Sequence, residues 1–358
     1  MRNTLKSAGL VMTLLLLIGT FASCKKTVKK EVIADNTIVA EIKEEPKVIR
    51  EPLVFITGID SGDNDFYAAA RQYFIEQEYE VVDDAFSLEE IINWLNRNYD
   101  ERLYGEIHIV SHSNPWKGMS LETVIKGERT TVESLKKYAI EGKLPTLNNV
   151  IASNAKVVLH SCGVGENTGL LKMFKNIFTT DETPDIVASP YYTVFGKELT
   201  SHYLAKPYYG FYPTANSPGK VDLSKEFARA YPNEKDIDWY DALNNERERY
   251  VGEPYTYQFN IPVEWEIDYS TSDKGAPTFK MAEEIMDFIA EDENLAKDFS
   301  AFNIPLEKFR WKSYVKGDKL IIKGKTTVLC VLKPLIKPYG DLEHIAPEID
   351  NLRLYNVE

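Results

Sequence analysis

The chain has 358 residues, of which 44% are hydrophobic and 27% are charged, and its formal net charge at pH 7 is −13. This length allows one large domain or two smaller ones, and the hydrophobic content is typical of a globular protein with a buried core. Because phosphate binding requires clustered Lys and Arg side chains, the acidic balance argues against nucleic acid as the main partner.

The amino terminus has the pattern of a targeting segment. Arg2 and Lys6 supply positive charge, residues 10–17 form an apolar run, and small residues precede Cys24. The apolar run is too short to span a bilayer with confidence. The segment resembles a bacterial lipoprotein signal, in which cleavage leaves the cysteine as the lipid-bearing first residue. We therefore expect residues 1–23 to be a signal peptide and Cys24 to anchor the protein to the cell envelope, at the outer membrane. An ordinary secretory signal cleaved nearby is the alternative.

The chain after Cys24 divides into three parts by composition. Residues 24–51 are rich in Lys, Glu, Val and Ile and end near two prolines, which indicates a flexible tether. Residues 52–215 are expected to form an α/β domain. Residues 216–358 are expected to form an aromatic-rich α+β extension or a second domain.

Short apolar runs alternate with helical patterns through the α/β region. The runs that predict buried strands are residues 53–58, 80–82, 106–112, 156–162 and 185–189. Asp65 is expected to cap the first helix, and Ser87 with Glu90 forms a capping box before the second. A third helix is expected within residues 132–140. Alternation of this kind predicts a mostly parallel sheet with helices on both faces.

The region after residue 215 has a different pattern. A helical segment is predicted at about residues 279–289, and a hairpin is predicted over residues 319–329 with its turn at Gly324. Residues 116–150, between the third and fourth predicted strands, are long enough to form a flap over the carboxyl edge of the sheet.

Two of the predicted strands end in residues that carry chemistry. One ends at His112, and the other ends at Cys162 before a helix that begins near Thr168. Ligands bind beyond the carboxyl ends of the strands in an open α/β sheet, so neighbouring strands would place both side chains in one crevice. An imidazole activates a thiol as a nucleophile, and a helix amino terminus favours the thiolate. Backbone N–H groups of Ser113, Cys162 and Gly163 are expected to stabilise an oxyanion.

These two strand ends resemble the caspase-like cysteine peptidase superfamily, which includes gingipains, clostripain and separases. In that family a hydrophobic strand ends in His-Gly and the next strand of the sheet ends in Cys. The matching positions here are His112 and Cys162, which are 162 − 112 = 50 residues apart. The resemblance covers roughly residues 52–200. It implies a caspase-like fold, a peptide or protein substrate, no cofactor and no metal. We expect a lipid-anchored cysteine endopeptidase with His112 as general base and Cys162 as nucleophile.

Substrate-binding residues are expected in the loops that follow the predicted strands. Asp60 and Asp63 follow the first strand and would favour a basic residue before the cut bond. Tyr191 and Tyr192 follow the fifth strand and would form an apolar wall.

Other functions remain open for the same residues. Ser113 is a candidate nucleophile of an α/β-hydrolase elbow, although Ser111 and Pro115 stand where such elbows usually have Gly. Residues 163–169 are Gly-rich, follow a strand and precede a helix, as a dinucleotide-binding loop does. A disulfide between Cys162 and Cys330 would remove the proposed nucleophile.

Two further alternatives concern metal binding and the absence of catalysis. Asp60, Asp63 and Asp65 are spaced closely enough to consider Ca²⁺, but they lack the pattern of an EF-hand. Ser113 stands where the caspase-like family usually has Gly, and no specificity-pocket residue is matched. A non-catalytic caspase-like lipoprotein is therefore the main alternative, with its aromatic-rich region binding peptide, glycan or protein.

Overall fold

The computed structural model describes residues 48–58, 64–196, 202–214, 218–243, 252–272, 275–335 and 347–358. The expected signal peptide, Cys24, nearly all of the tether, and the loop residues Asp60 and Asp63 lie outside these ranges. The described residues belong to one compact unit, Lys47–Glu358. In this part of the chain, no helix combines the length and the apolar character needed to cross a bilayer.

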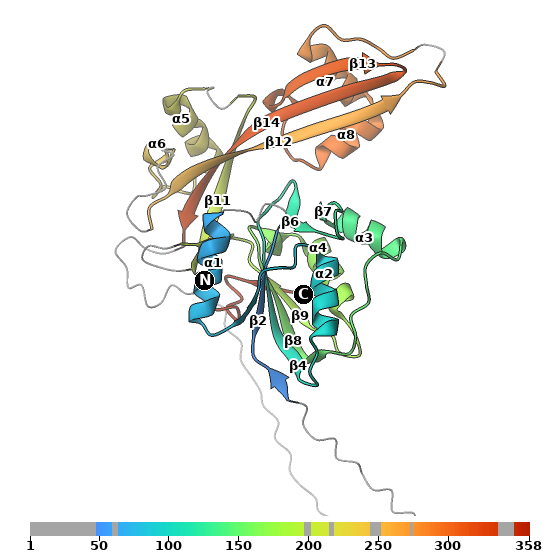
Figure 1. Ribbon diagram of the computed structural model, residues 1–358. Helices are drawn as coiled ribbons and strands as arrows, with labels where there is room; N and C mark the ends of the chain where they lie inside the picture. Colours follow the sequence, from blue (N-terminus) through green and yellow to red (C-terminus); the bar gives the residue numbers. More distant parts are fainter. Residues whose placement is uncertain are drawn as a thin grey trace, which may run out of the picture. The chain divides into compact units, whose positions relative to one another are not determined.

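A mostly parallel sheet forms the centre of the amino-terminal half (Figure 1). Its strands lie in the order β15-β9-β8-β4-β2-β3, and β1 also pairs with β4. Their bounds are β1 Ile49–Arg50, β2 Leu53–Ile56, β3 Glu80–Val82, β4 Leu103–Val110, β8 Ile151–His160, β9 Asp185–Ala188 and β15 Asn356–Val357. The pairs from β3 to β9 are parallel, whereas β15 is antiparallel to β9. The predicted α/β class and parallel sheet are confirmed.

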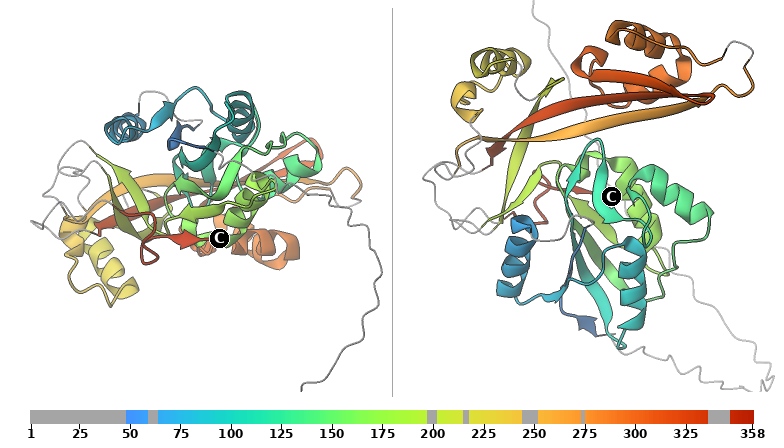
Figure 2. Two further views of the ribbon diagram at one scale, coloured as in Figure 1. Left: turned by 90° about the horizontal axis from the view of Figure 1, so that it is seen from below. Right: turned by 45° about the horizontal axis from the view of Figure 1, so that its top comes forward.

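Helices cover both faces of this sheet, as the alternating side chains of β2 require. Val54 and Ile56 pack with α1 (Asp65–Glu76), whereas Leu53 and Phe55 pack with α2 (Leu88–Arg97) and α4 (Thr168–Phe178). Figure 1 shows α1 on one side of the sheet and α2 on the other, and Figure 2 shows this from a second direction. A one-residue shift of β2 would exchange these two faces, so burial on both faces fixes the register.

The starts of the first two helices test the predicted caps. Ser87 accepts a hydrogen bond from the Glu90 N–H at 3.1 Å, which confirms Ser87 as the cap of α2. The second half of the predicted capping box differs, because Glu90 Oε2 accepts from the Phe86 N–H and the Ser87 hydroxyl, each at 2.9 Å, and not from the Ser87 N–H. At α1 the prediction was wrong by one residue. The cap is Asn64, whose Oδ1 accepts from the Phe66 N–H at 2.9 Å, and Asp65 is the first helical residue.

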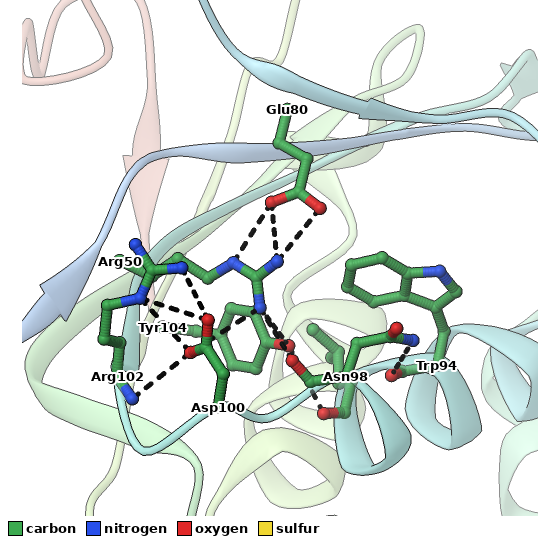
Figure 3. Close-up of polar contacts among 8 residues, drawn as sticks. Arg50, Glu80, Trp94, Asn98, Asp100, Arg102 and Tyr104 are labelled. Carbon is green, nitrogen blue, oxygen red and sulfur yellow. Dashed lines mark hydrogen bonds and ion pairs between the residues drawn. The ribbon is translucent and has the colours of Figure 1, made fainter.

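An Arg side chain fixes the amino ends of the sheet (Figure 3). Arg50 donates to both carboxylate oxygens of Glu80, with distances of 2.8 to 3.1 Å, and to Asn98 O at 2.7 Å. Its guanidinium carbon also lies 5.7 Å from the Trp94 ring centroid and 5.3 Å from that of Tyr104. A forked, stacked Arg is well suited to such a position. Arg50 therefore links β1 to the starts of β3 and β4, at the end of the sheet opposite the candidate site.

A second sheet is antiparallel and rich in aromatic residues. Its order is β10-β11-β14-β12, with β13 also paired to β14. Its strands are β10 Tyr192–Phe195, β11 His202–Tyr212, β12 Tyr255–Asp268, β13 Arg310–Lys316 and β14 Lys319–Pro334. It therefore takes strands from both sides of the expected boundary at residue 215. One face packs with α5 (Lys220–Ala230) and α6 (Trp239–Ala242), and the other packs with α7 (Ala282–Glu291) and α8 (Glu293–Ser300).

The predicted turn at Gly324 is wrong. β14 continues through Gly324, and the connection between β13 and β14 lies at Gly317, whose φ is +61°. Gly324 stands directly opposite Trp311, and a Cβ atom at this position would lie 2.3 Å from the Trp311 ring. The glycine therefore provides space for a cross-strand aromatic ring and does not mark a turn.

The predicted flap region forms a small antiparallel sheet and a helix. The strands are β5 Ser113–Asn114, β6 Gly118–Glu122 and β7 Arg129–Thr130, and α3 (Val132–Ile140) follows them. The Trp116 indole N–H donates to Phe302 O at 2.9 Å, which joins this region to the end of α8. The predicted helix at residues 132–140 is confirmed.

Candidate functional site

His112 and Cys162 lie at the same edge of the parallel sheet. Val110 and His160 are register partners at the carboxyl ends of the adjacent strands β4 and β8. His112 lies two residues after Val110, and Cys162 lies two residues after His160. The expectation that their strands are neighbours is therefore confirmed, and the two residues occupy equivalent positions where α/β sheets usually bind ligands.

Hydrogen bonds join the two chain segments at this edge. The Ser113 hydroxyl donates to Cys162 O at 2.6 Å, and the Ser161 hydroxyl donates to Ser111 O at 2.7 Å. The Ser111 N–H also donates to His160 O at 3.3 Å. These bonds fix the backbone around both candidate residues, and Ser111 and Ser161 are fully buried.

The imidazole of His112 is held against the start of α1. Its Nε2 lies 3.1 Å from Asn64 Nδ2, and its ring stacks on Phe66 with centroids 4.2 Å apart. Asn64 Oδ1 accepts the α1 capping bond, so we assign Nδ2 as the donor and His112 Nε2 as the acceptor. The backbone N–H of His112 donates to the Tyr67 hydroxyl at 3.0 Å. His112 Nε2 therefore carries a lone pair, as a general base requires.

The Cys162 thiol faces the aromatic sheet. Its sulfur donates to Thr193 O over 3.7 Å, and it packs with Tyr192, Cys330 and Leu332. Although the residue as a whole is half-buried, burial of the sulfur raises the pKa of the Cys162 thiol to about 12. The thiol is therefore neutral at pH 7 in this arrangement. Cys162 and Cys330 are both free, so the alternative disulfide is not formed.

The turn after Cys162 is built from glycines that approach β9. Gly163 has φ +71°, a left-handed conformation that favours glycine. At Gly165 a Cβ atom would lie 2.5 Å from Ala188 O. The Gly163 N–H donates to Tyr191 O at 3.0 Å, and the Gly165 N–H donates to Ser189 O at 2.9 Å. Gly163 was expected to donate to an oxyanion, but its N–H group is already bonded within the fold.

The predicted tyrosine wall is divided between two environments. Tyr192 is buried beside the Cys162 thiol, and its hydroxyl accepts a hydrogen bond from Tyr209 at 3.0 Å. Tyr191 is half-buried and packs instead with Val158 and Tyr355. Tyr192 therefore lies at the candidate nucleophile, whereas Tyr191 supports the sheet.

A buried chain of titratable groups, which sequence reasoning missed, lies on the same face of the sheet as His112. His108 Nε2 lies 2.6 Å from Glu106 Oε1, and His108 Nδ1 lies 2.7 Å from His160 Nε2. His202 crosses His160 edge to face, with centroids 5.5 Å apart. Burial lowers the pKa of all three imidazoles, that of His202 to about 3. The period-two spacing of Glu106, His108 and His112 was the available signal, but no local pattern points to His202.

Two alternative sites receive no support from this geometry. Ser113 begins β5 and its hydroxyl is bonded to Cys162 O, whereas an elbow nucleophile stands at a strand-to-helix turn. Within residues 163–169, Gly163 is explained by its left-handed backbone and Gly165 by its close approach to Ala188 O of β9. Among the described residues, no three His, Cys, Asp or Glu side chains are gathered so that they could hold a metal ion.

Comparisons with models of protein families, with curated proteins and with solved structures find no match to this chain. The functional argument therefore depends on the geometry of its own residues.

Proposed function

We propose that the protein is a cysteine endopeptidase in which Cys162 is the nucleophile and His112 is the general base. The observation that carries this proposal is the register of β4 and β8, which gives His112 and Cys162 equivalent positions at one sheet edge. A thiol and an imidazole are the groups that acyl transfer requires, and the Nε2 lone pair of His112 accepts from Asn64 in this arrangement.

The reaction would begin with transfer of the thiol proton to His112 Nε2. Sulfur then attacks the peptide carbonyl carbon, the C–N bond breaks, and the imidazolium returns its proton to the leaving amine. Water, deprotonated by His112, hydrolyses the thioester and regenerates the thiol. Before this sequence starts, two bonds of the resting arrangement must be exchanged: the thiol with Thr193 O and the imidazole with Asn64. Substrate binding at the edge is the step to which we assign this exchange.

The wider assignment is a caspase-like protein anchored in the bacterial cell envelope. Its support is the pair of strand-end motifs and the amino-terminal pattern that ends in Cys24. If Cys24 carries lipid, Cys24→Ala transfers the protein from the membrane fraction to the soluble fraction of the envelope. Unchanged membrane association of this variant contradicts the anchor.

A second candidate function, a non-catalytic binding module, is favoured by a specific observation. Burial raises the pKa of the Cys162 thiol, and a neutral thiol is a poor nucleophile. In this alternative, the half-buried aromatic side chains of the second sheet would contact a peptide, glycan or protein partner, and Cys162 would contribute packing.

Cleavage of an unstructured protein such as casein by the full chain distinguishes the two functions. The endopeptidase predicts that Cys162→Ala and His112→Ala each lower the rate by at least about 100-fold, because either change removes a reacting group. Cys330→Ala, which changes the neighbouring thiol, should retain most of the rate. Cleavage that survives Cys162→Ala overturns the endopeptidase. So does the absence of cleavage by a folded wild-type protein, with or without limited proteolytic trimming.

A further inference from the structure

One end of the second sheet is three strands wide in the described part of the chain. It consists of β13, residues 319–325 of β14 and residues 262–268 of β12, with β14 in the middle. Figure 1 shows the three strands side by side. Among the described strands, β12 and β13 each pair with β14 alone. Both outer edges of this three-stranded end are therefore open to pairing with a strand of another chain.

A proline shows which backbone groups of β12 point outward. Pro262 stands opposite Lys325 in a register that continues without a break from Tyr255 to Asp268. Proline has no N–H group, so its nitrogen lies on the side of the strand away from β14. Backbone groups alternate along a strand, so the N–H groups of Glu264 and Glu266 point to the same side as the Pro262 nitrogen. These donors are directed toward the position of an added strand.

The two edges carry opposite charges on one face of the sheet. Cross-strand neighbours form three rows that run from β13 through β14 to β12: Lys312–Lys323–Glu264, Tyr314–Ile321–Glu266 and Lys316–Lys319–Asp268. Every charged side chain in these rows is exposed. The edge formed by β13 is therefore basic, and the edge formed by β12 is acidic.

The rows that contain two lysines are not balanced within one molecule. Lys323 pairs with Glu264 at 2.9 Å, and Lys319 pairs with Glu266. Within the described residues, neither Lys312 nor Lys316 makes an ion pair. Each stands directly opposite another lysine of β14, and like charges in this register destabilise a sheet. An acidic strand placed beside β13 would offset this repulsion.

The other face of the three-stranded end carries apolar side chains to both edges. Leu320 and Ile322, in the central strand, are fully buried. In the same rows, Val315 of β13 is 38% exposed, whereas Trp265 and Ile267 of β12 are half-buried. A strand added to either edge would therefore bury apolar surface on one face while it pairs charges on the other.

We propose that the protein associates with further copies of itself, so that β13 of one copy pairs with residues 262–268 of β12 in the next. If the rows continue in register, Lys312 and Lys316 of one copy lie opposite Glu264 and Asp268 of the next, and each acid then lies between two lysines. Two β12 edges repel each other, as do two β13 edges, so the charges oppose a symmetric dimer. A head-to-tail contact leaves one open edge at each end, so copies add into chains.

The proposal does not depend on the chemistry at Cys162. The contact involves only the seven residues of β13, so we expect weak association that depends on protein concentration and on salt.

Sedimentation velocity of the full chain tests the association. In low salt, the weight-average mass should rise at least about two-fold between about 1 and about 200 µM protein, and about 0.5 M NaCl should remove most of this rise. Lys312→Glu combined with Lys316→Glu should leave a monomer at all these concentrations. This variant replaces two like-charge pairs by opposite-charge pairs, so it should resist urea at least as well as the wild-type protein. Lys136→Glu combined with Lys172→Glu makes the same change in net charge at exposed positions of α3 and α4, and it should associate like the wild-type protein.

A complementary variant tests the pairing of the two edges. Glu264→Lys combined with Asp268→Lys makes both edges basic, so this variant alone should also remain a monomer. An equimolar mixture with the Lys312→Glu, Lys316→Glu variant should recover at least about half of the wild-type rise in mass, because each edge then meets one of opposite charge.

A wild-type protein that remains a monomer across the concentration range overturns the proposal. So does association that persists in the Lys312→Glu, Lys316→Glu variant, or a mixture of the two variants that remains monomeric although both are folded by circular dichroism. Association that strengthens in about 0.5 M NaCl also overturns it, because contact between apolar surfaces is then indicated.

Discussion

At Cys162, packing and reactivity impose opposite requirements. The sulfur packs with Tyr192 and Cys330 and donates to a backbone carbonyl, and this burial raises the pKa of its thiol to about 12. A nucleophile at neutral pH needs the thiolate, which a neighbouring imidazolium stabilises. The proposed enzyme therefore needs His112 to approach the sulfur during its reaction cycle.

The buried histidines make the stability of the folded state depend on pH. The pKa of His202 is lowered from 6.5 to about 3 by burial, so the unfolded chain binds this proton more readily than the folded chain does. The stability that the neutral His202 side chain contributes is complete above pH 6.5 and is lost as pH falls from 6.5 toward 3. His108 and His160 shift in the same direction.

His202→Phe should reduce this acid sensitivity. The ring of His202 stacks on Phe195 with centroids 4.5 Å apart, so Phe keeps the aromatic contact without a titrating group. One unit of pKa shift corresponds to 1.36 kcal/mol, so this side chain contributes about 2 kcal/mol to the stability lost between pH 6.5 and 4.5. Urea unfolding at pH 7.5 and pH 4.5 measures the difference. An identical loss of stability in the variant and the wild-type protein contradicts the assignment.

At the scale of elements, the turn between Cys162 and α4 depends on a close backbone approach to β9. Gly165→Ala places a methyl group 2.5 Å from Ala188 O and from the Ser189 carbonyl carbon, which is too close for van der Waals contact. Overpacking of this kind costs about 1–3 kcal/mol, and the resulting shift would move Cys162 away from its position. Thermal unfolding measures the stability. Gly219→Ala, at the N-cap of α5 with open space around it, is the control and should cost less than about 1 kcal/mol, because its only loss is a slightly poorer helix cap. Equal effects of the two substitutions would argue against the close approach.

Short-range patterns in the sequence predicted most helices and strands. The errors arose where the structure depends on contacts between residues far apart in the sequence. Ser87 and Glu90 are three residues apart, so the cap that Ser87 forms with the Glu90 N–H was visible in the sequence. Gly324 was interpreted as a turn because the ring that fills its space belongs to Trp311, which is paired with it only in the folded sheet. Asn64 and Asp65 are both good caps, and composition alone does not choose between them.

At the candidate site, too, short-range patterns predicted some features, and contacts between distant parts of the chain account for the rest. The edge shared by His112 and Cys162 followed from two strand patterns and the rule for parallel sheets. The neighbours of Cys162 did not, because Tyr192 and Cys330 come from strands that are far apart in sequence and join in the second sheet. The partner of His112, Asn64, comes from the start of α1. Sequence patterns thus placed His112 and Cys162 at one edge of the sheet but did not reveal the contacts of their side chains.

At the scale of the whole molecule, Trp116 links the chain after β5 to the aromatic sheet. Its indole N–H donates to Phe302 O, and its ring centroid lies 5.0 Å from that of Tyr209 and 5.8 Å from that of Phe259. These contacts join the segment that follows His112 to residues that lie 93, 143 and 186 positions after Trp116. They therefore contribute to global stability.

Trp116→Ala should lower the free energy of unfolding by about 2 kcal/mol, less than full burial of a Trp would give, because the side chain is half-buried. Trp116→Phe should lose about 1 kcal/mol, since it keeps the ring contacts and loses the hydrogen bond. Urea denaturation followed by circular dichroism measures both values. Wild-type stability of the Ala variant contradicts the proposed link.

The central claim, that His112 activates Cys162, is tested most directly by covalent labelling of the native protein. A peptidyl acyloxymethyl ketone is added at pH 7.5, and the modified residue is identified by mass spectrometry. The account predicts modification at Cys162, none at the buried Cys330, and a rate at least about 100-fold lower in His112→Ala. Equal labelling of Cys162 in the wild-type protein and in His112→Ala, or labelling that occurs only after unfolding in urea, would contradict it.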